Sequence, residues 1–242
     1  YALPFLLSLS IIQFGCKQSS DSEIKSDHKN PKEEQVNGES IVEVPTSPED
    51  FVPDGAFLFK KIEGDLNNDG LEDVVIITKQ TDSSRIVQDE YLGELDRNRR
   101  GIIVALKKDK GYHLIVRNDT CFSSENEDGG VYFPPELVVE IEDGKLFFHY
   151  AHGRYGFWRY NFRLKDSDFE LIGYDQSDHQ GPILHYSYSY NFLTGKKLTK
   201  ENVNFYSENP QDEVFKETWE TISNNKRLLL SEIKDFDALI FN

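Results

Sequence analysis

Residues 136–151, ELVVEIEDGKLFFHYA, show a regular alternation of apolar and polar side chains on either side of a turn signal. Apolar side chains alternate with glutamates over 136–142, which is the period of two that places them on one face of a β-strand. Asp143-Gly144 follows, and both residue types tolerate the positive φ angles of a tight hairpin turn. A second run of apolar and aromatic residues comes directly after the turn. The stretch therefore predicts an antiparallel β-hairpin.

Short runs of the same kind fill the chain on both sides of this hairpin. FWRYNFRL (157–164) places Trp158, Tyr160 and Phe162 on one face of a strand and arginines on the other. We therefore assign Trp158 to the core in preference to an exposed sugar-stacking platform. Tight turns join neighbouring runs, with further strands expected at 101–107, 112–117, 169–174 and 183–192. Strands that follow one another through tight turns predict an all-β fold built mainly as an antiparallel meander.

One helix is expected near the C-terminal end. Asn209 suits the N-cap, Pro210 suits the first helical position, and two acidic residues follow in the first turn. Phe215, Trp219 and Ile222 then fall at the i, i+4 and i+7 spacing of one apolar stripe. The pattern predicts a helix that lies on the sheet.

The charge balance bears on the partners of this protein. The 242 residues include 43 Asp and Glu against 27 Lys and Arg, a formal net charge of −16. Nucleic-acid binding depends on clustered basic side chains that meet the phosphate backbone, so a nucleic-acid partner is not expected. A strong negative balance suits solubility and cation binding.

The first residues are apolar up to Gly15 and turn polar directly after Cys16. This run is shorter than the roughly 20 residues that span a membrane. It resembles a bacterial lipoprotein signal over residues 1–16, although Gln13-Phe14 departs from that pattern. The resemblance implies that Cys16 is lipidated and anchors the protein to a membrane. The alternatives are an ordinary secretory signal and a buried thiol. If Cys16 carries lipid, Cys121 has no cysteine partner within the chain.

Residues 17–50 contain no aromatic side chain, few aliphatic ones and many charges. Such a composition does not compensate the entropy lost on ordering, so we expect a flexible tether. The segment resembles tethers of surface lipoproteins in the Bacteroidetes group. This organisation predicts a lipid-anchored protein of the bacterial cell envelope, on an outer membrane facing the periplasm or the surface. Residues 51–242 then form one β-rich globular domain.

The stretch GDLNNDGLEDVVIIT (64–78) places oxygen donors at alternate positions and leads into an apolar strand. The donors are the side chains of Asp65, Asn67, Asp69 and Asp73 and the carbonyl of Leu71. This spacing matches the first part of an EF-hand loop, in which a glycine permits the sharp turn around the ion. A plain turn is the alternative interpretation, because Asx side chains also bond backbone amides in turns.

The loop differs from an EF-hand at the twelfth position, where Ile76 replaces the bidentate glutamate. It resembles instead the calcium loops of FG-GAP and VCBS-type repeats, which form the blades of integrin-like propellers. This resemblance implies a structural Ca²⁺ on Asp65, Asn67, Asp69, Leu71 and Asp73. Over residues 57–200 the chain resembles bacterial lipoproteins with one such loop and no established activity, which implies blade-like antiparallel sheets.

Two other groups of residues could bind a cation. The acidic stretch 123–136 could add a second site, although a plain acidic loop is the favoured interpretation. His149 and His152 lie three residues apart, so on a strand they point to opposite faces, and structural or surface roles are expected for both.

Glycines next to an aromatic run at 153–159 make Tyr155, Phe157 and Arg159 candidates for an exposed ligand-binding surface. Because no catalytic motif stands out, we expect a non-catalytic binding or adhesion module for a glycan or a protein. The alternative function is a hydrolase of envelope polymers or glycans. That function requires paired carboxylates in one cleft, with Glu136, Asp175 and Asp178 as candidates.

Overall fold

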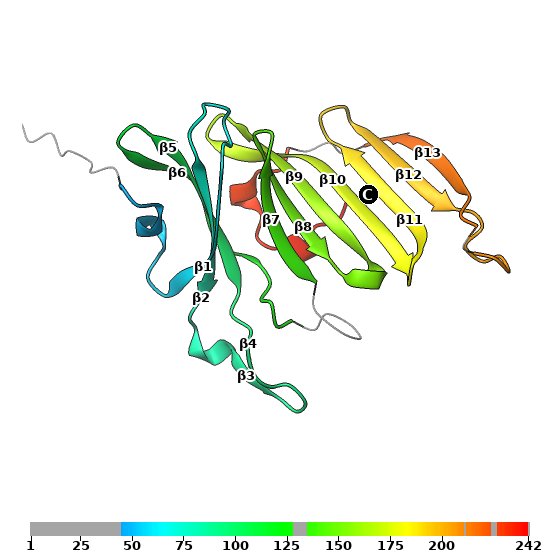
Figure 1. Ribbon diagram of the computed structural model, residues 1–242, viewed down its shortest axis with the longest axis horizontal. Coiled ribbons are helices and arrows are strands. Elements are labelled where there is room, and N and C mark those ends of the chain that lie inside the picture. Colours follow the sequence, from blue (N-terminus) through cyan, green and yellow to red (C-terminus); the bar gives the residue numbers. More distant parts are fainter. Residues whose placement is uncertain (1–44, 128–134, 211, 224–226, 242) are drawn as a thin grey trace, which may run out of the picture. The chain divides into compact units, whose positions relative to one another are not determined.

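The hairpin at 136–151 forms as the sequence predicts. In the computed structural model (Figure 1), β7 (Glu136–Glu142) and β8 (Lys145–Ala151) pair antiparallel over their whole length. Asp143 and Gly144 take φ angles of 49° and 68° in the connecting turn. The structure describes residues 45–127, 135–210, 212–223 and 227–241, which belong to one compact unit.

The hairpin begins a seven-stranded antiparallel sheet in which every strand pairs with the next one in the sequence. This sheet is the expected meander. Its remaining strands are β9 (Gly156–Lys165), β10 (Asp168–Gln180), β11 (Ile183–Asn191), β12 (Lys196–Asn202) and β13 (Phe215–Thr221).

A second, four-stranded sheet comes from the earlier part of the domain, and its strands also follow sequence order. They are β1 (Ala56–Gly64), β2 (Asp73–Gln80), β5 (Arg100–Lys108) and β6 (Gly111–Phe122). The two inner strands, β2 and β5, are buried on both faces, as their continuous runs of Val and Ile indicate. A short hairpin of β3 (Ile86–Asp89) and β4 (Gly93–Asp96) stands between them in the sequence.

One core joins the two sheets. Val75 and Ile102 of the smaller sheet share a buried cluster with Phe148 and Phe162 of the larger sheet. The chain end completes this cluster through two short 3-10 segments, η4 (Leu230–Glu232) and η5 (Phe236–Ala238), drawn red in Figure 1. Phe236 stacks on Phe122 at 4.7 Å between ring centroids. The chain end is therefore an integral part of the core.

The helix expected after Asn209 is not found, and this prediction is corrected by the structure. Residues Phe215–Thr221 form the edge strand β13. The strand supplies hydrogen-bond partners for β12, and Lys200 pairs with Glu217 across the two strands at 2.8 Å. Every residue of β13 is exposed, so Phe215 and Trp219 of the expected apolar stripe cover no core, whereas Ile222, just beyond the strand, packs partly buried against it.

The remaining 3-10 segments are η1 (Pro48–Phe51), η2 (Ser83–Arg85) and η3 (Gly153–Tyr155). Within the described part of the chain, none of the helices has the length and apolar character needed to span a membrane.

Candidate functional site

The loop before β2 is closed by the carboxylate of Asp65. Its Oδ1 accepts hydrogen bonds from the amides of Asn67 and Asp69, both at 3.2 Å, and its Oδ2 accepts one from Gly70 at 2.8 Å. The Gly70 bond is the largest of the effects that hold the pKa of Asp65 below its ordinary value. Gly70 has a φ of +83°, a conformation that side-chain-bearing residues rarely adopt. The sequence therefore wraps the chain tightly around one carboxylate.

Asp73 ties the end of this loop to the neighbouring strand. Its Oδ2 accepts from the Leu66 amide and its Oδ1 from the Lys107 amide of β5, each at 2.8 Å. The side chain is fully buried, and burial raises its pKa despite these two bonds. The charges of Asp69 and Asp65 raise the pKa of Asp73 further. The loop thus holds repelling carboxylates near one another.

The donor chemistry of this loop fits Ca²⁺, which prefers carboxylate, amide and carbonyl oxygens. The same oxygens also satisfy amides: Asp69 Oδ1 accepts from Leu71, and Asn67 Nδ2 donates to Asp69 Oδ2, both at 2.9 Å. Among the residues that the structure describes, no group of three or more His, Cys, Asp or Glu side chains is arranged to hold a metal ion. The loop therefore has calcium-type donors that are engaged within the loop itself.

Several other sequence candidates lie away from any shared site. His149 belongs to β8, and its ring contacts Phe157, whereas His152 follows the strand and contacts Tyr155. Cys121 is a free thiol buried in the core. Cys16, the tether up to residue 44 and residues 128–134 of the acidic stretch lie outside the described residues.

The proposed surface of Tyr155, Phe157 and Arg159 lies at the start of β9. Phe157 and Arg159 alternate with Trp158 and Tyr160 along the strand, so they point away from the core. The Arg159 guanidinium lies 4.0 Å from the centroid of the Phe147 ring. Tyr155 and Phe157 are both about one-third exposed, at 37% and 36%.

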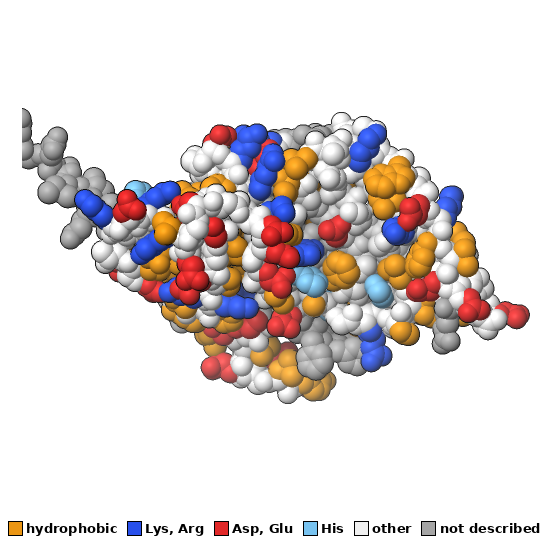
Figure 2. Space-filling model, turned by 45° about the horizontal axis from the view of Figure 1, so that its top comes forward, with side chains coloured by type: hydrophobic (Ala, Val, Ile, Leu, Met, Phe, Trp, Pro, Cys, Tyr) orange, Lys and Arg blue, Asp and Glu red, His pale blue; other side chains and the backbone are white. Residues whose placement is uncertain are grey.

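Figure 2 shows one face of the molecule on which acidic, basic and apolar side chains are interspersed. Over the part of that face formed by described residues, no broad basic area is visible.

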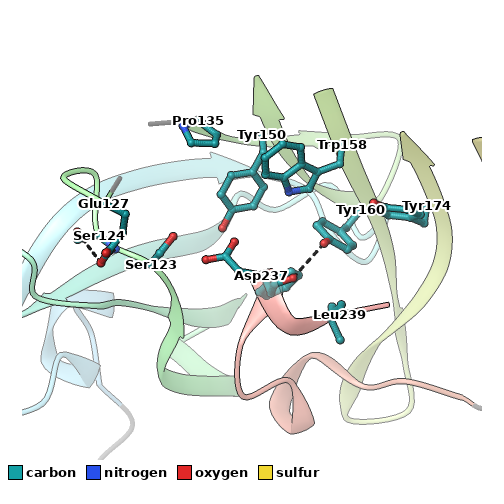
Figure 3. A pocket seen from close by; sticks show the side chains of 11 residues that line it. Ser123, Ser124, Glu127, Pro135, Tyr150, Trp158, Tyr160, Tyr174, Asp237 and Leu239 are labelled. Atoms are coloured by element: carbon teal, nitrogen blue, oxygen red, sulfur yellow. Dashed lines mark hydrogen bonds between the residues drawn. The ribbon is translucent and has the colours of Figure 1, made fainter. Parts of the chain in front are cut away.

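A different site lies between the larger sheet and the chain end. It is a solvent-open cavity of about 340 Å³, lined by residues that are distant from one another in the sequence (Figure 3). Its aromatic wall comes from β8, β9, β10 and η5: Tyr150, Trp158, Tyr160, Tyr174 and Phe236. Its polar lining comes from the segment after β6 and from η5: Ser123, Ser124, Glu127 and Asp237.

Tyr150 is the unusual residue of this cavity. It is only 2% exposed, and its hydroxyl is buried without a hydrogen-bond partner. Its ring stacks on the indole of Trp158, with 5.4 Å between centroids and 13° between the planes. Burial, followed by the charge of Asp237, raises the pKa of Tyr150, so the hydroxyl keeps its proton at neutral pH. A buried hydroxyl without a partner costs about 1–3 kcal/mol of stability.

The neighbouring tyrosines are different, because both have a partner. Tyr160 donates to the carbonyl of Phe236 at 3.2 Å, and Tyr174 donates to Oε1 of Gln176 at 3.0 Å. Burial raises the pKa of Tyr174 to about 12. The missing partner is thus a property of Tyr150 and not of the whole aromatic wall.

The carboxylate of Asp237 faces the cavity from η5. In Figure 3 the Tyr150 hydroxyl and this carboxylate point toward each other across the cavity. Asp235 positions this turn by accepting from the Asp237 amide at 3.1 Å and from Arg99 Nη2 at 3.0 Å. Asn118 of β6 fixes the preceding turn by donating to the carbonyls of Leu230 and Ile233.

A second carboxylate, Glu127, lines the cavity beside Ser124, whose hydroxyl donates to it at 3.0 Å.

A positively charged side chain, Arg100, lies behind the polar lining formed by Ser123 and Ser124. Arg100 is only 4% exposed and donates from Nε to the Ser123 carbonyl at 2.7 Å. Burial lowers the pKa of Arg100, while Tyr150, Glu125, Asp237 and Glu127 act on it electrostatically in the opposite direction.

The carboxylates named for a hydrolase do not line this cavity. Glu136 is exposed at the start of β7, Asp175 accepts from the Ser189 hydroxyl at 2.6 Å, and Asp178 lies 3.6 Å from His185. Sequence reasoning missed Tyr150 and Asp237 as site residues, and it considered the stretch that contains Glu127 only as a candidate cation site. One signal for the aromatic wall was present in the sequence: the alternation along 157–164 predicts that Trp158 and Tyr160 share the inner face of the strand. The structure confirms that both side chains lie on this face, where they line the cavity.

A scan against protein-family profiles and searches of curated proteins and of solved structures found no match to this chain.

Proposed function

We propose that the β domain is a non-catalytic binding module and that the aromatic cavity holds its ligand. The observation that carries this proposal is the Tyr150 hydroxyl, which is buried, unpartnered and directed into the cavity. Binding sites combine apolar and aromatic walls with a few polar groups that fix the ligand's orientation. A ligand that hydrogen-bonds Tyr150 removes the energetic cost that the hydroxyl carries in the free protein.

In this proposal the module stands on a bacterial envelope membrane, attached through a lipid on Cys16 and the tether that follows. The loop from Asp65 to Asp73 takes a structural Ca²⁺. The repulsion that Asp65 and Asp69 exert on Asp73 supports this part, because a cation would relieve it. Calcium would stabilise the conformation of the loop that precedes β2 and would not take part in ligand binding.

The two tryptophans of the chain allow a direct test. Trp158 lines the cavity, whereas Trp219 is 65% exposed on β13. Protein labelled with 5-fluorotryptophan gives one ¹⁹F resonance for each, and Trp219→Phe assigns them. A diverse library of small fragments is screened at millimolar concentration. We expect a subset of fragments to shift the Trp158 resonance alone. If no fragment shifts it, or if every active fragment moves both resonances equally, the binding proposal is wrong.

A hydrolase is the second candidate, because two carboxylates, Glu127 and Asp237, line the same cavity. Glycoside hydrolysis uses two such groups on opposite sides of the scissile bond. The test is release of nitrophenol from a panel of nitrophenyl glycosides. The binding proposal predicts no release above that of Asp237→Asn. Turnover that Asp237→Asn and Glu127→Gln each abolish would favour the hydrolase.

A further inference from the structure

We propose that the cavity selects an uncharged, polyhydroxylated ring, which is the chemistry of a neutral sugar residue. This inference rests on the proposed binding function and adds the class of ligand to it. It follows from the charges around the cavity, from the mixture of donors and acceptors that line it and from the accessible indole.

The charges disfavour anions, and a buried arginine offsets part of the attraction that the carboxylates exert on cations. An anion entering the cavity would meet the carboxylates of Glu127 and Asp237. A cation would be attracted by these groups but would approach the guanidinium of Arg100, which lies behind the Ser123 wall and acts on the same carboxylates. Cation recognition by aromatic residues also requires open ring faces. Here Tyr160 packs against Tyr174 and Phe236 at 5.0 Å from each, and Tyr150 covers one face of the Trp158 indole, so a cation could reach only the part of the indole that stays accessible.

The polar groups suit hydroxyls, which both donate and accept hydrogen bonds. The carboxylates of Asp237 and Glu127 accept, and one carboxylate can accept from two adjacent hydroxyls. The protonated Tyr150 hydroxyl and the indole N–H of Trp158 donate, while Ser123 can do either. A ligand with acceptors alone could not donate to the carboxylates, and a ligand with donors alone could not accept from Tyr150 or from the indole N–H.

The apolar groups suit the C–H face of a sugar ring. Trp158 is only half-buried although it lines the cavity, so part of the indole is accessible. Leu239 borders the same space at its lower side in Figure 3. A ring with hydroxyls at its edge and C–H bonds on its face matches a cavity with an aromatic wall and carboxylates at its margins.

The test uses Trp219→Phe, in which Trp158 is the sole source of tryptophan fluorescence. The protein is titrated with N-acetylglucosamine and the methyl glycosides of glucose, galactose and mannose. Glucuronate is the anionic control with a matched ring, and choline is a small cationic control. We expect at least one neutral sugar to change the Trp158 emission saturably. Glucuronate should bind at least tenfold more weakly than that sugar, and choline should have no effect.

Variants connect the signal to the cavity. Tyr150→Phe should weaken sugar binding roughly fivefold, the effect of one neutral hydrogen bond. Asp237→Asn should weaken it on the order of 10–100-fold, since that bond involves a charge. Tyr91→Phe and Asp212→Asn, which change exposed residues outside the cavity, are the matched controls and should bind as the parent does.

The outcomes separate this inference from the function on which it rests. If fragments shift the Trp158 resonance but no neutral sugar changes the Trp158 emission, the sugar assignment is wrong and the binding function stands. The same conclusion follows if choline or glucuronate binds more tightly than every neutral sugar. If the fragment screen also fails, both are wrong. Sugar binding that Tyr150→Phe and Asp237→Asn leave unchanged would place the sugar elsewhere and overturn the assignment.

Discussion

Tyr150 and Tyr160 lie on adjacent strands and line the same cavity, yet only Tyr160 has a hydrogen-bond partner for its hydroxyl. Proteins leave few buried polar groups unpaired, and the Tyr150 hydroxyl is one of several such groups in the described part of this chain, the one that lines the cavity. The pair therefore allows the same chemical change, removal of one hydroxyl, to be made in two neighbouring places.

Tyr150→Phe should stabilise the free protein by about 1–2 kcal/mol, because it removes a hydroxyl that is buried without a partner. Tyr160→Phe should destabilise it by about 1 kcal/mol, because the bond to the Phe236 carbonyl is lost. For a domain of this size each kcal/mol corresponds to about 2–4 °C in melting temperature. Differential scanning calorimetry measures both shifts. Equal losses of stability in the two variants would mean that Tyr150 is satisfied in solution.

Calcium should raise the melting temperature of the domain. An ion that binds only the folded loop stabilises by mass action, by about 2.7 kcal/mol at one hundred times its Kd. We expect a weak extracellular-type site with a Kd on the order of 10⁻⁴–10⁻³ M, so about 10 mM Ca²⁺ should shift the melting temperature by several degrees. Mg²⁺ should substitute poorly, because it requires stricter octahedral geometry.

Asp69→Ala removes an exposed oxygen donor of the loop and should abolish most of the calcium response. Asp54→Ala, an exposed aspartate in a different turn, is the matched control and should respond as the parent does. A melting temperature that stays constant from chelator to 10 mM Ca²⁺, roughly ten times the weakest expected Kd, would leave Asp65, Asn67 and Asp69 as turn residues only.

The carboxylate of Asp65 should make the free energy of unfolding of the domain decrease at acidic pH. Its pKa in the folded protein lies below the ordinary value of 3.8, since the amides of Gly70, Asn67 and Asp69 bind the charged form. The stability that these bonds provide is therefore fully present above pH 3.8 and is lost as the pH falls through the folded-state pKa. Asp73 acts in the opposite direction, because its pKa is raised and protonation relieves its burial.

In chelator, the difference in unfolding free energy between the parent and Asp65→Asn should consequently shrink as the pH falls from about 5 to about 2. Urea titrations at several pH values measure this difference, and Asp54→Asn serves as the control. A difference that is constant over this range would show that Asp65 acts through shape and not through charge.

The membrane anchor is tested at Cys16. If this residue is lipidated, Cys16→Ala expressed in a bacterial host should accumulate as an unprocessed precursor or appear in the soluble fraction. It should also lose the label of a metabolic fatty-acid probe, while Cys121→Ala should keep it. Equal labelling of the Cys16→Ala variant and the parent would rule out this anchor.

The sequence predicted the larger sheet well, because its strands alternate cleanly and its turns contain residues that favour turns. The bounds of β7 and β8 match the prediction at 136–142 and 145–151. The strand beginning at 169 was predicted to end at 174, but β10 continues to Gln180. Its polar end, DQSDHQ, contains little of the apolar alternation that identifies strands, so only pairing with β9 and β11 reveals it.

The prediction of a C-terminal helix was wrong because the segment that forms β13 is compatible with both a helical and a strand pattern. Phe215, Trp219 and Ile222 fit a helical stripe, but Thr218 and Trp219 also favour a strand. Cross-strand contacts with β12, such as Lys197 with Glu220, were not visible in the local pattern. Tertiary pairing therefore decided the structure of this segment.

The cavity could not be predicted, because its residues are distant in the sequence. Tyr150 and Trp158 come from one hairpin, but Glu127 lies before it and Asp237 comes from the chain end. The short segment around Asp237 has no motif that indicates a site. Only the packing of Phe236 into the core brings its neighbour Asp237 to the aromatic wall.

The most direct test of the cavity as a sugar site is a crystal structure of the domain with the tightest-binding neutral sugar. We predict a sugar ring against Trp158, with one of its oxygens at about 2.5–3.2 Å from the Tyr150 hydroxyl and another at that distance from Asp237. A sugar bound elsewhere, with the Tyr150 hydroxyl still unpartnered, would contradict the account.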